Sequence, residues 1–163
     1  MKFAIADPPY IGQARKHYQC EEIDHKELIE LLVNDYPDGW ALCASSPSLR
    51  QILPLCPPDV RVMSWVKPFC SFKPGVNPAY AWEPVIVRGG RKRTREQPTI
   101  RDWVSANITL KKGLCGAKPE PFCIWLFEVL NMVATDQLDD LYYGTGAVTK
   151  SWELYKEQYA ASS

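Results

Sequence analysis

The stretch that decides the fold is residues 3–10, Phe-Ala-Ile-Ala-Asp-Pro-Pro-Tyr. Residues 3–6 are continuously apolar, which is typical of a short strand buried on both faces. Pro8 and Pro9 cannot continue a ladder of backbone hydrogen bonds, so the strand must end before them. The sequence therefore predicts a buried strand with the carboxylate of Asp7 at its carboxyl tip.

Helices and strands alternate along the rest of the chain. Asp24 and Glu27 have the spacing of a capping box, which predicts a helix that ends near Pro37. Further strands are predicted at 40–45, 60–66, 83–88 and 138–142, and further helices at 46–53, from 119 and after 146. The pattern indicates one α/β domain over residues 1–163, an open sheet of about five strands with helices on both faces. Residues 89–118 show no sustained period and are predicted to be an inserted loop.

Composition places few limits on function. The 163 residues suffice for one ordinary domain, and 46% hydrophobic with 23% charged residues is usual for a globular protein. Nineteen basic and nineteen acidic residues give a net charge of zero. Global electrostatics therefore do not favour nucleic acid or membrane as a partner, and any such partner must meet a local patch.

Targeting signals and metal motifs are not evident. The apolar start is interrupted by Asp7, and no apolar run approaches the roughly 20 residues of a membrane span, so we expect a cytoplasmic protein. The six cysteines include no Cys-x-x-Cys pair. Reduced, buried thiols are expected in place of disulfides or a metal site.

A glycine turn follows the last predicted strand, where residues 140–146 are Asp-Leu-Tyr-Tyr-Gly-Thr-Gly. Glycines between a strand and a helix let a ligand approach the backbone without meeting a Cβ. The turn is not a phosphate-binding P-loop, because no Gly-Lys-Ser/Thr follows it. A tight turn without a ligand explains this motif equally well.

The Asp-Pro-Pro-Tyr turn carries more chemical information. Its prolines hold Asp7, the Pro8 carbonyl and the Tyr10 ring in fixed relation, which suits a flat aminated heterocycle. Two oxygens would accept its N–H groups and the ring would stack on its face. The alternative is a structural turn with a capping Asp7 and a core Tyr10.

These two motifs, together with Lys118-Pro119 at the start of a helix, resemble the DNA adenine-N6 methyltransferases that use S-adenosylmethionine. The order, with Asp-Pro-Pro-Tyr first and the glycine motif last, is similar to the permuted class found in many phage and prophage enzymes. The resemblance implies a Rossmann-like methyltransferase sheet and a bacterial or phage-infected host cell.

The resemblance also implies a role for each motif. Asp7 and the Pro8 carbonyl would bind the exocyclic amine of a flipped adenine, Pro9 would shape the turn, and Tyr10 would stack on the base. Binding of S-adenosylmethionine is implied for Lys118, Pro119, Asp140, Tyr142, Tyr143, Gly144, Thr145 and Gly146. Contact with DNA phosphates is predicted for a basic run that begins at the end of the predicted strand 83–88 and continues into the inserted, target-recognising loop, although a solvated surface is equally compatible: Arg88, Arg91, Lys92, Arg93 and Arg95.

The sequence departs from the family after Gly146, where only seventeen residues remain and a further strand that would hold the cofactor ribose is not expected. The adenosine side of the pocket would be open, lined by loops, or completed by another chain, in a homodimer or with a partner. Cytosine N4, an RNA adenine and a protein amide are alternative targets, and Asp7 favours adenine over cytosine and the amide. A catalytically silent nucleic-acid-binding relative is the alternative from another functional class.

Overall fold

A computed structural model describes residues 1–12, 22–69, 73–109 and 117–162, with side chains described as far as residue 158. Within that part of the chain, no helix is both long and apolar enough to cross a membrane. Cys43, Cys56 and Cys123 are free thiols; Cys43 and Cys123 are buried, whereas Cys56 is only partly buried. The other three cysteines lie outside the described residues.

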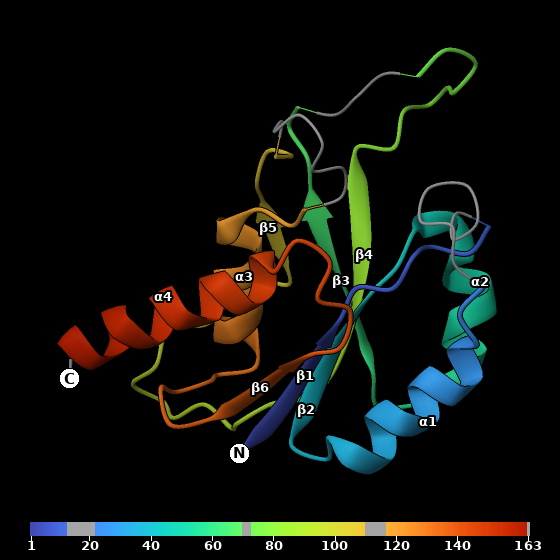
Figure 1. Cartoon of the computed structure of the whole chain (residues 1–163). Coiled ribbons are helices and arrows are strands. Elements are labelled where there is room, and N and C mark those ends of the chain that lie inside the picture. The colour runs from blue at the N-terminus through green and yellow to red at the C-terminus, as the bar shows by residue number, and fades with distance from the viewer. Residues whose placement is uncertain (13–21, 70–72, 110–116, 163) are drawn as a thin grey trace.

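The described residues form a mixed sheet of six strands in the order β5-β3-β4-β2-β1-β6 (Figure 1). Strand β1 lies between β2 and β6 and is parallel to both, whereas β4 is antiparallel to β2 and β3. The strands are β1 (Lys2–Ala6), β2 (Gly39–Cys43), β3 (Arg61–Val66), β4 (Trp82–Gly89), β5 (Trp103–Ser105) and β6 (Gln137–Asp140).

Helices cover both faces of this sheet (Figure 1). On one face lie α1 (His25–Asp35) and the short α2 (Leu49–Ile52), which has a 3-10 turn at each end. On the other face lie α3 (Glu120–Val129) and α4 (Ala147–Ser162). The predicted cap of α1 is present, because the Asp24 side chain accepts hydrogen bonds from two backbone amides of the first turn.

The core is divided by the sheet because successive side chains of a strand point to opposite faces. Phe3 and Ile5 of β1 pack with Phe122 of α3 on one face. Ala4 and Ala6 pack with α1 and α2 on the other. The short apolar run of β1 is therefore buried on both sides, and the predicted Rossmann-like α/β fold is confirmed.

The strand count differs from the prediction, since the sheet has six strands and not about five. The additional strand, β5, lies inside the segment 89–118 that the sequence predicts as a loop. It pairs in parallel with β3, with Ser64 opposite Trp103. Three residues are too few to establish an alternating pattern, so β5 is recognisable only from its pairing.

Candidate active site

The two sequence motifs meet at one end of the sheet. Strands β1 and β6 are adjacent and parallel, with Ile5 opposite Asp140. Asp7 and Gly144 therefore follow neighbouring strands at the same carboxyl edge, where two motifs that serve one pocket would have to lie. In open α/β sheets this edge is where ligands bind.

Asp7 forms an ion pair with a buried lysine. The Nζ of Lys118 lies 2.8 Å from Oδ1 of Asp7, and the lysine is only 8% exposed. Its chain segment leads into α3, whose N-cap is Pro119. Lys118 is predicted to bind the cofactor, whereas in the structure its ammonium group lies on the Asp-Pro-Pro-Tyr turn.

A second carboxylate completes this cluster. Glu83, near the start of β4, accepts a hydrogen bond from the hydroxyl of Tyr10 and lies 2.7 Å from the Nζ of Lys67. The Nζ of Lys118 is 3.7 Å from the same carboxylate and 3.4 Å from the Tyr10 hydroxyl oxygen. Two carboxylates and two ammonium groups thus surround one phenol, with their formal charges in balance.

Aromatic rings flank the two lysines. The Nζ of Lys118 lies 5.6 Å from the ring centre of Tyr10 and 5.7 Å from that of Trp65. The Nζ of Lys67 lies 5.4 Å from the Trp65 ring centre. The Trp65 indole is held by a 2.8 Å hydrogen bond to the carbonyl of Ala106. Cation–π attraction of this kind strengthens where the ammonium group is removed from water.

Burial and charge set the protonation states of the cluster. Burial raises the pKa of Tyr10 well above its ordinary value, so its hydroxyl remains a donor at neutral pH. Burial lowers the pKa of Lys118, but the acidic groups around it, Asp7 foremost, together outweigh burial and the pKa ends well above its ordinary value. Burial also raises the pKa of Glu83, yet Lys118 and the hydrogen bond from Lys67 bring it below the usual range.

Glu83, Lys67 and Trp65 belong to the site but are not among the residues predicted from the sequence. Glu83 is predicted only as the first residue of a strand, and Lys67 only follows the predicted strand 60–66, with no motif around it. A charged residue at a strand end of an α/β sheet was the available signal. It was not specific, because only strand pairing shows which strand ends lie together.

The glycine turn joins β6 to α4 with backbone that only glycine adopts readily. Gly144 and Gly146 have φ of +47° and +72°. A Cβ on Gly146 would lie 2.6 Å from the hydroxyl oxygen of Tyr143. The Asp140 carboxylate accepts a 3.0 Å hydrogen bond from Thr149 of α4, and burial raises its pKa. The hydrogen bond from Thr149 thus connects the start of the turn to α4.

The aromatic residues of the turn differ in exposure. Tyr143 is 59% exposed, whereas Tyr142 is partly buried against the core of α1 and α2. Burial raises the pKa of Tyr142. Thr145 is partly exposed, and Pro119 at the start of α3 is buried. Tyr143 is consequently the aromatic side chain of this turn most accessible to a ligand.

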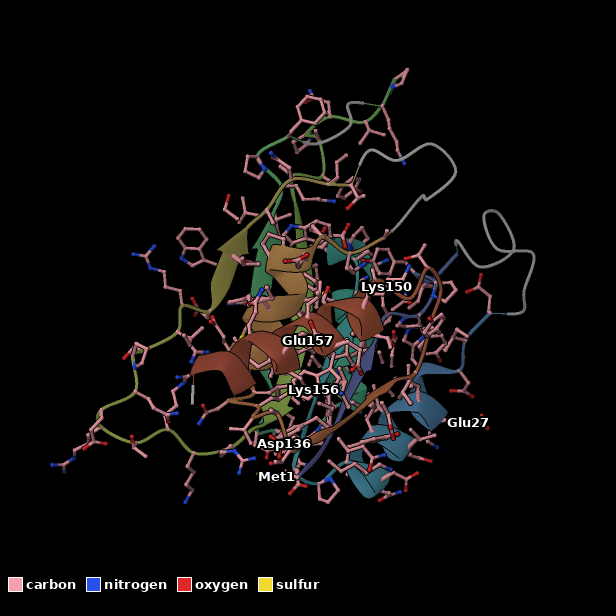
Figure 2. The ribbon with its side chains drawn as sticks, turned by 60° about the vertical axis from the view of Figure 1, so that its left-hand side comes forward. Met1, Glu27, Asp136, Lys150, Lys156 and Glu157 are labelled. Atoms are coloured by element: carbon pink, nitrogen blue, oxygen red, sulfur yellow. The ribbon has the colours of Figure 1, made fainter. Side chains whose placement is uncertain are left out.

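The basic run lies at the opposite end of the sheet from Asp7, since Gly89 pairs with Gly39 at the start of β2. The Nη2 of Arg91 donates to both carboxylate oxygens of Asp136, at 2.6 and 2.7 Å. Figure 2 shows Met1 and Asp136 together at this end, where the terminal amine lies 2.8 Å from Asp136.

Three members of the run thus have partners within the fold. Besides Arg91, Arg88 pairs with Asp59, and Arg93 donates to the backbone carbonyls of Pro98 and Glu128. Lys92 and Arg95 are exposed. The structure therefore does not bring the run together with the Asp-Pro-Pro-Tyr turn, and its contact with phosphates stays a prediction.

Two solved structures have the same fold as this chain. The crystal structure of M1.HpyAVI in complex with SAM matches with a TM-score of 0.62 and 14% identity, over 96% of this chain and 78% of that chain. A crystal structure of M1.HpyAVI matches with a TM-score of 0.61 and 12% identity, over 94% and 76% of the two chains. No protein-family model and no curated protein sequence matches the chain.

Proposed function

We propose that this chain transfers a methyl group from S-adenosylmethionine to the exocyclic N6 of a flipped adenine in DNA. The observation that carries the proposal is the pairing of β1 with β6, which places the Asp-Pro-Pro-Tyr turn beside the glycine turn. Donor and acceptor of a methyl group must share one pocket. The likeness of the fold to a protein solved with SAM supports the same assignment.

The glycine turn fits the methionine end of this cofactor. Gly144 leaves the backbone open, since a Cβ there would meet only the carbonyl of Tyr142 at 3.7 Å. The amides at the start of α4 would donate hydrogen bonds to the amino-acid carboxylate, as helix N-termini do for anions. When bound, S-adenosylmethionine supplies an electrophilic methyl group. We assign the binding of S-adenosylmethionine to Asp140 and Tyr142–Gly146, with Lys118-Pro119 on the same side of the pocket.

Asp7 and the Pro8 carbonyl are the acceptors we assign to the target amine. The lone pair of adenine N6 is delocalised into the ring, which makes the nitrogen a poor nucleophile. Hydrogen bonds from N6 to these two oxygens favour a more tetrahedral nitrogen whose lone pair can attack in line. As the bond between nitrogen and methyl carbon forms, the bond between that carbon and sulfur would break and release a neutral thioether, which leaves the nitrogen cationic. The Asp7 carboxylate stabilises that charge until N6 releases one of its protons.

Lys118 positions the Asp7 carboxylate, and Glu83 positions the Tyr10 ring. The ion pair with Lys118 occupies Oδ1 of Asp7, so the second carboxylate oxygen is the acceptor that we assign to the amine. Glu83 accepts the hydrogen bond from Tyr10 and so orients its ring, which is the stacking surface for the flipped base. Stacking there offsets the few kcal/mol that unpairing a base costs. Pro9 constrains the backbone between Asp7 and Tyr10.

Two partners are proposed for this chain, the target DNA and a second protein chain. The segment 89–118, with Lys92 and Arg95 exposed, is assigned to recognition of the DNA target. Strand β6 is at the edge of the sheet. A second copy or a partner chain beside this edge would complete the adenosine side of the cofactor pocket. Sedimentation of the chain with and without S-adenosylmethionine tests whether the cofactor promotes association.

The direct test is transfer of labelled methyl groups from S-adenosylmethionine to duplex DNA, followed by nucleoside analysis. N6-methyladenine is the expected product. N4-methylcytosine as the product, or label found only in RNA or protein, would show that the same chemistry acts on a different target. Calorimetry without detectable binding of S-adenosylmethionine, combined with intact DNA binding, would instead support the silent nucleic-acid-binding alternative.

A further inference from the structure

The connection between β3 and β4 forms an arm that projects from the sheet at the Asp7 end (Figure 1). Its described residues are 67–69 and 73–82. At its base the amide of Lys67 donates a 2.8 Å hydrogen bond to the carbonyl of Ala81, which continues the pairing of the two strands. The arm is therefore an extension of the sheet and rises from its carboxyl edge.

The arm carries exposed aromatic rings. In the described part of the chain, Phe69 is 57% exposed and Tyr80 is 56% exposed, and Trp82 at the start of β4 is 41% exposed. Rings that are not buried in a core are available to stack on planar groups.

The charge of the arm favours an anionic partner. The sequence from 67 to 82 contains Lys67 and Lys73 but no Asp or Glu, in a chain whose net charge is zero. Lys73 is exposed. Pro68, Pro74 and Pro78 restrict the backbone, which reduces the conformational entropy that binding would otherwise cost. Aromatic rings with lysine and without carboxylates are the usual surface for unpaired bases and their phosphates.

The base of the arm is connected to the candidate active site. Lys67 precedes the arm, Glu83 follows it, and their side chains form a 2.7 Å ion pair. The same Glu83 accepts the hydrogen bond from Tyr10. A strand of DNA whose base enters the pocket at Tyr10 would thus have its neighbouring nucleotides close to the arm.

We propose that the arm binds the target DNA next to the flipped base. Phe69 and Tyr80 stack on the bases that lose a neighbour when the target nucleotide leaves the duplex, and Lys73 contacts a phosphate. The choice of DNA as the occupant rests on the function proposed above. The arm would thus provide the DNA-contacting surface nearest the pocket, whereas the basic run lies at the other end of the sheet.

The test is fluorescence anisotropy with a labelled duplex of about two helical turns that carries one unpaired adenine. Base–aromatic stacking is worth about 1–3 kcal/mol per base, so Phe69→Ala and Tyr80→Ala are each expected to weaken binding by about 5-fold to 150-fold. Tyr80→Phe is the matched control and should bind like the unmodified chain, because the stacking ring is kept. Lys73→Ala should lower the salt slope by about 0.9, whereas the aromatic variants leave it unchanged.

The opposite end of the sheet gives the competing outcome. Replacing Lys92 and Arg95 together with Ala removes two exposed charges of the basic run and should change affinity less than Phe69→Ala does. Binding that falls with this pair and not with the arm variants would overturn the proposal. Methyl transfer and cofactor binding are measured separately. DNA binding through the arm without methyl transfer would contradict the proposed function alone. Methyl transfer to DNA that is unchanged in the arm variants would contradict only the proposed role of the arm.

Discussion

The ammonium group of Lys118 lies 2.8 Å from the carboxylate of Asp7, so the segment that opens α3 is tied to the tip of β1. Both groups belong to motifs recognised in the sequence, yet the prediction assigned them to different ligands. Because Lys118 is 8% exposed, its charge depends on this carboxylate and on Glu83 for compensation. The pair therefore affects both stability and the proposed chemistry.

We expect Asp7→Ala to lower methyl transfer by more than about 100-fold, the scale of losing an electrostatic contact made in the transition state. Binding of S-adenosylmethionine should change little, because Asp7 is assigned to the base. Since Asp7→Ala also leaves Lys118 without its closest partner, Asp7→Asn is the matched variant that keeps the shape of the side chain. Labelled transfer at an undiminished rate by both variants would remove Asp7 from the mechanism.

Lys118→Met should destabilise the fold even though methionine fills much of the same volume. Removing one member of a buried ion pair costs about 3–5 kcal/mol when it leaves the other charge uncompensated. Asp7 is less buried than Lys118, which places the expected loss toward the lower value. Urea unfolding measures it. The double variant Asp7→Asn with Lys118→Met should recover part of the loss, and strictly additive losses would show that the two groups do not interact.

Replacements of Tyr10 separate its hydroxyl from its ring. Tyr10→Phe removes the hydrogen bond to Glu83 but keeps the stacking surface. We therefore expect it to retain much more transfer activity than Tyr10→Ala, whose loss should correspond to stacking worth about 1–3 kcal/mol. The measurement is kcat and KM for a DNA substrate. Equal loss in the two variants would mean that the hydroxyl, and not the ring, is required.

Gly146→Ala is expected to weaken binding of S-adenosylmethionine and to lower stability by about 1–2 kcal/mol, because a φ of +72° is unfavourable for alanine. The new Cβ would also meet the Tyr143 hydroxyl. Combining it with Tyr143→Ala removes that contact but not the backbone strain. Calorimetry and thermal unfolding of the single and double variants measure the two contributions. Cofactor binding unaffected by Gly146→Ala would exclude this turn from the pocket.

Glu83 should make stability depend on acid pH. Its pKa in the folded protein is lowered, after burial is outweighed by Lys118 and the hydrogen bond from Lys67. The stabilisation is present above the ordinary pKa, about 4.3, and is lost as pH falls through the lower folded value. In Glu83→Gln the decline in unfolding free energy below about pH 4.3 should be shallower. Parallel profiles for the two proteins would show that Glu83 is not coupled to its lysines.

Local patterns in the sequence determined much of the architecture. The apolar residues 3–6, the cap at Asp24 and the periodic apolar face of α3 specify their elements without help from distant residues. The adjacency of β1 and β6 is not specified by either segment alone, although two motifs that serve one pocket require it. The short strand β5 was not predicted, since its three residues form a strand only by pairing with β3.

The charge cluster and the location of the basic run were decided by the tertiary structure alone. Glu83 reaches Tyr10 because antiparallel pairing brings the start of β4 to the carboxyl edge of β1 and β2. The same reversal carries Arg88 and Arg91 to the other end, where Arg91 pairs with Asp136. Sequence periodicity specifies which face of a strand is buried, but strand order and direction depend on contacts between distant segments, whose partners no local pattern encodes.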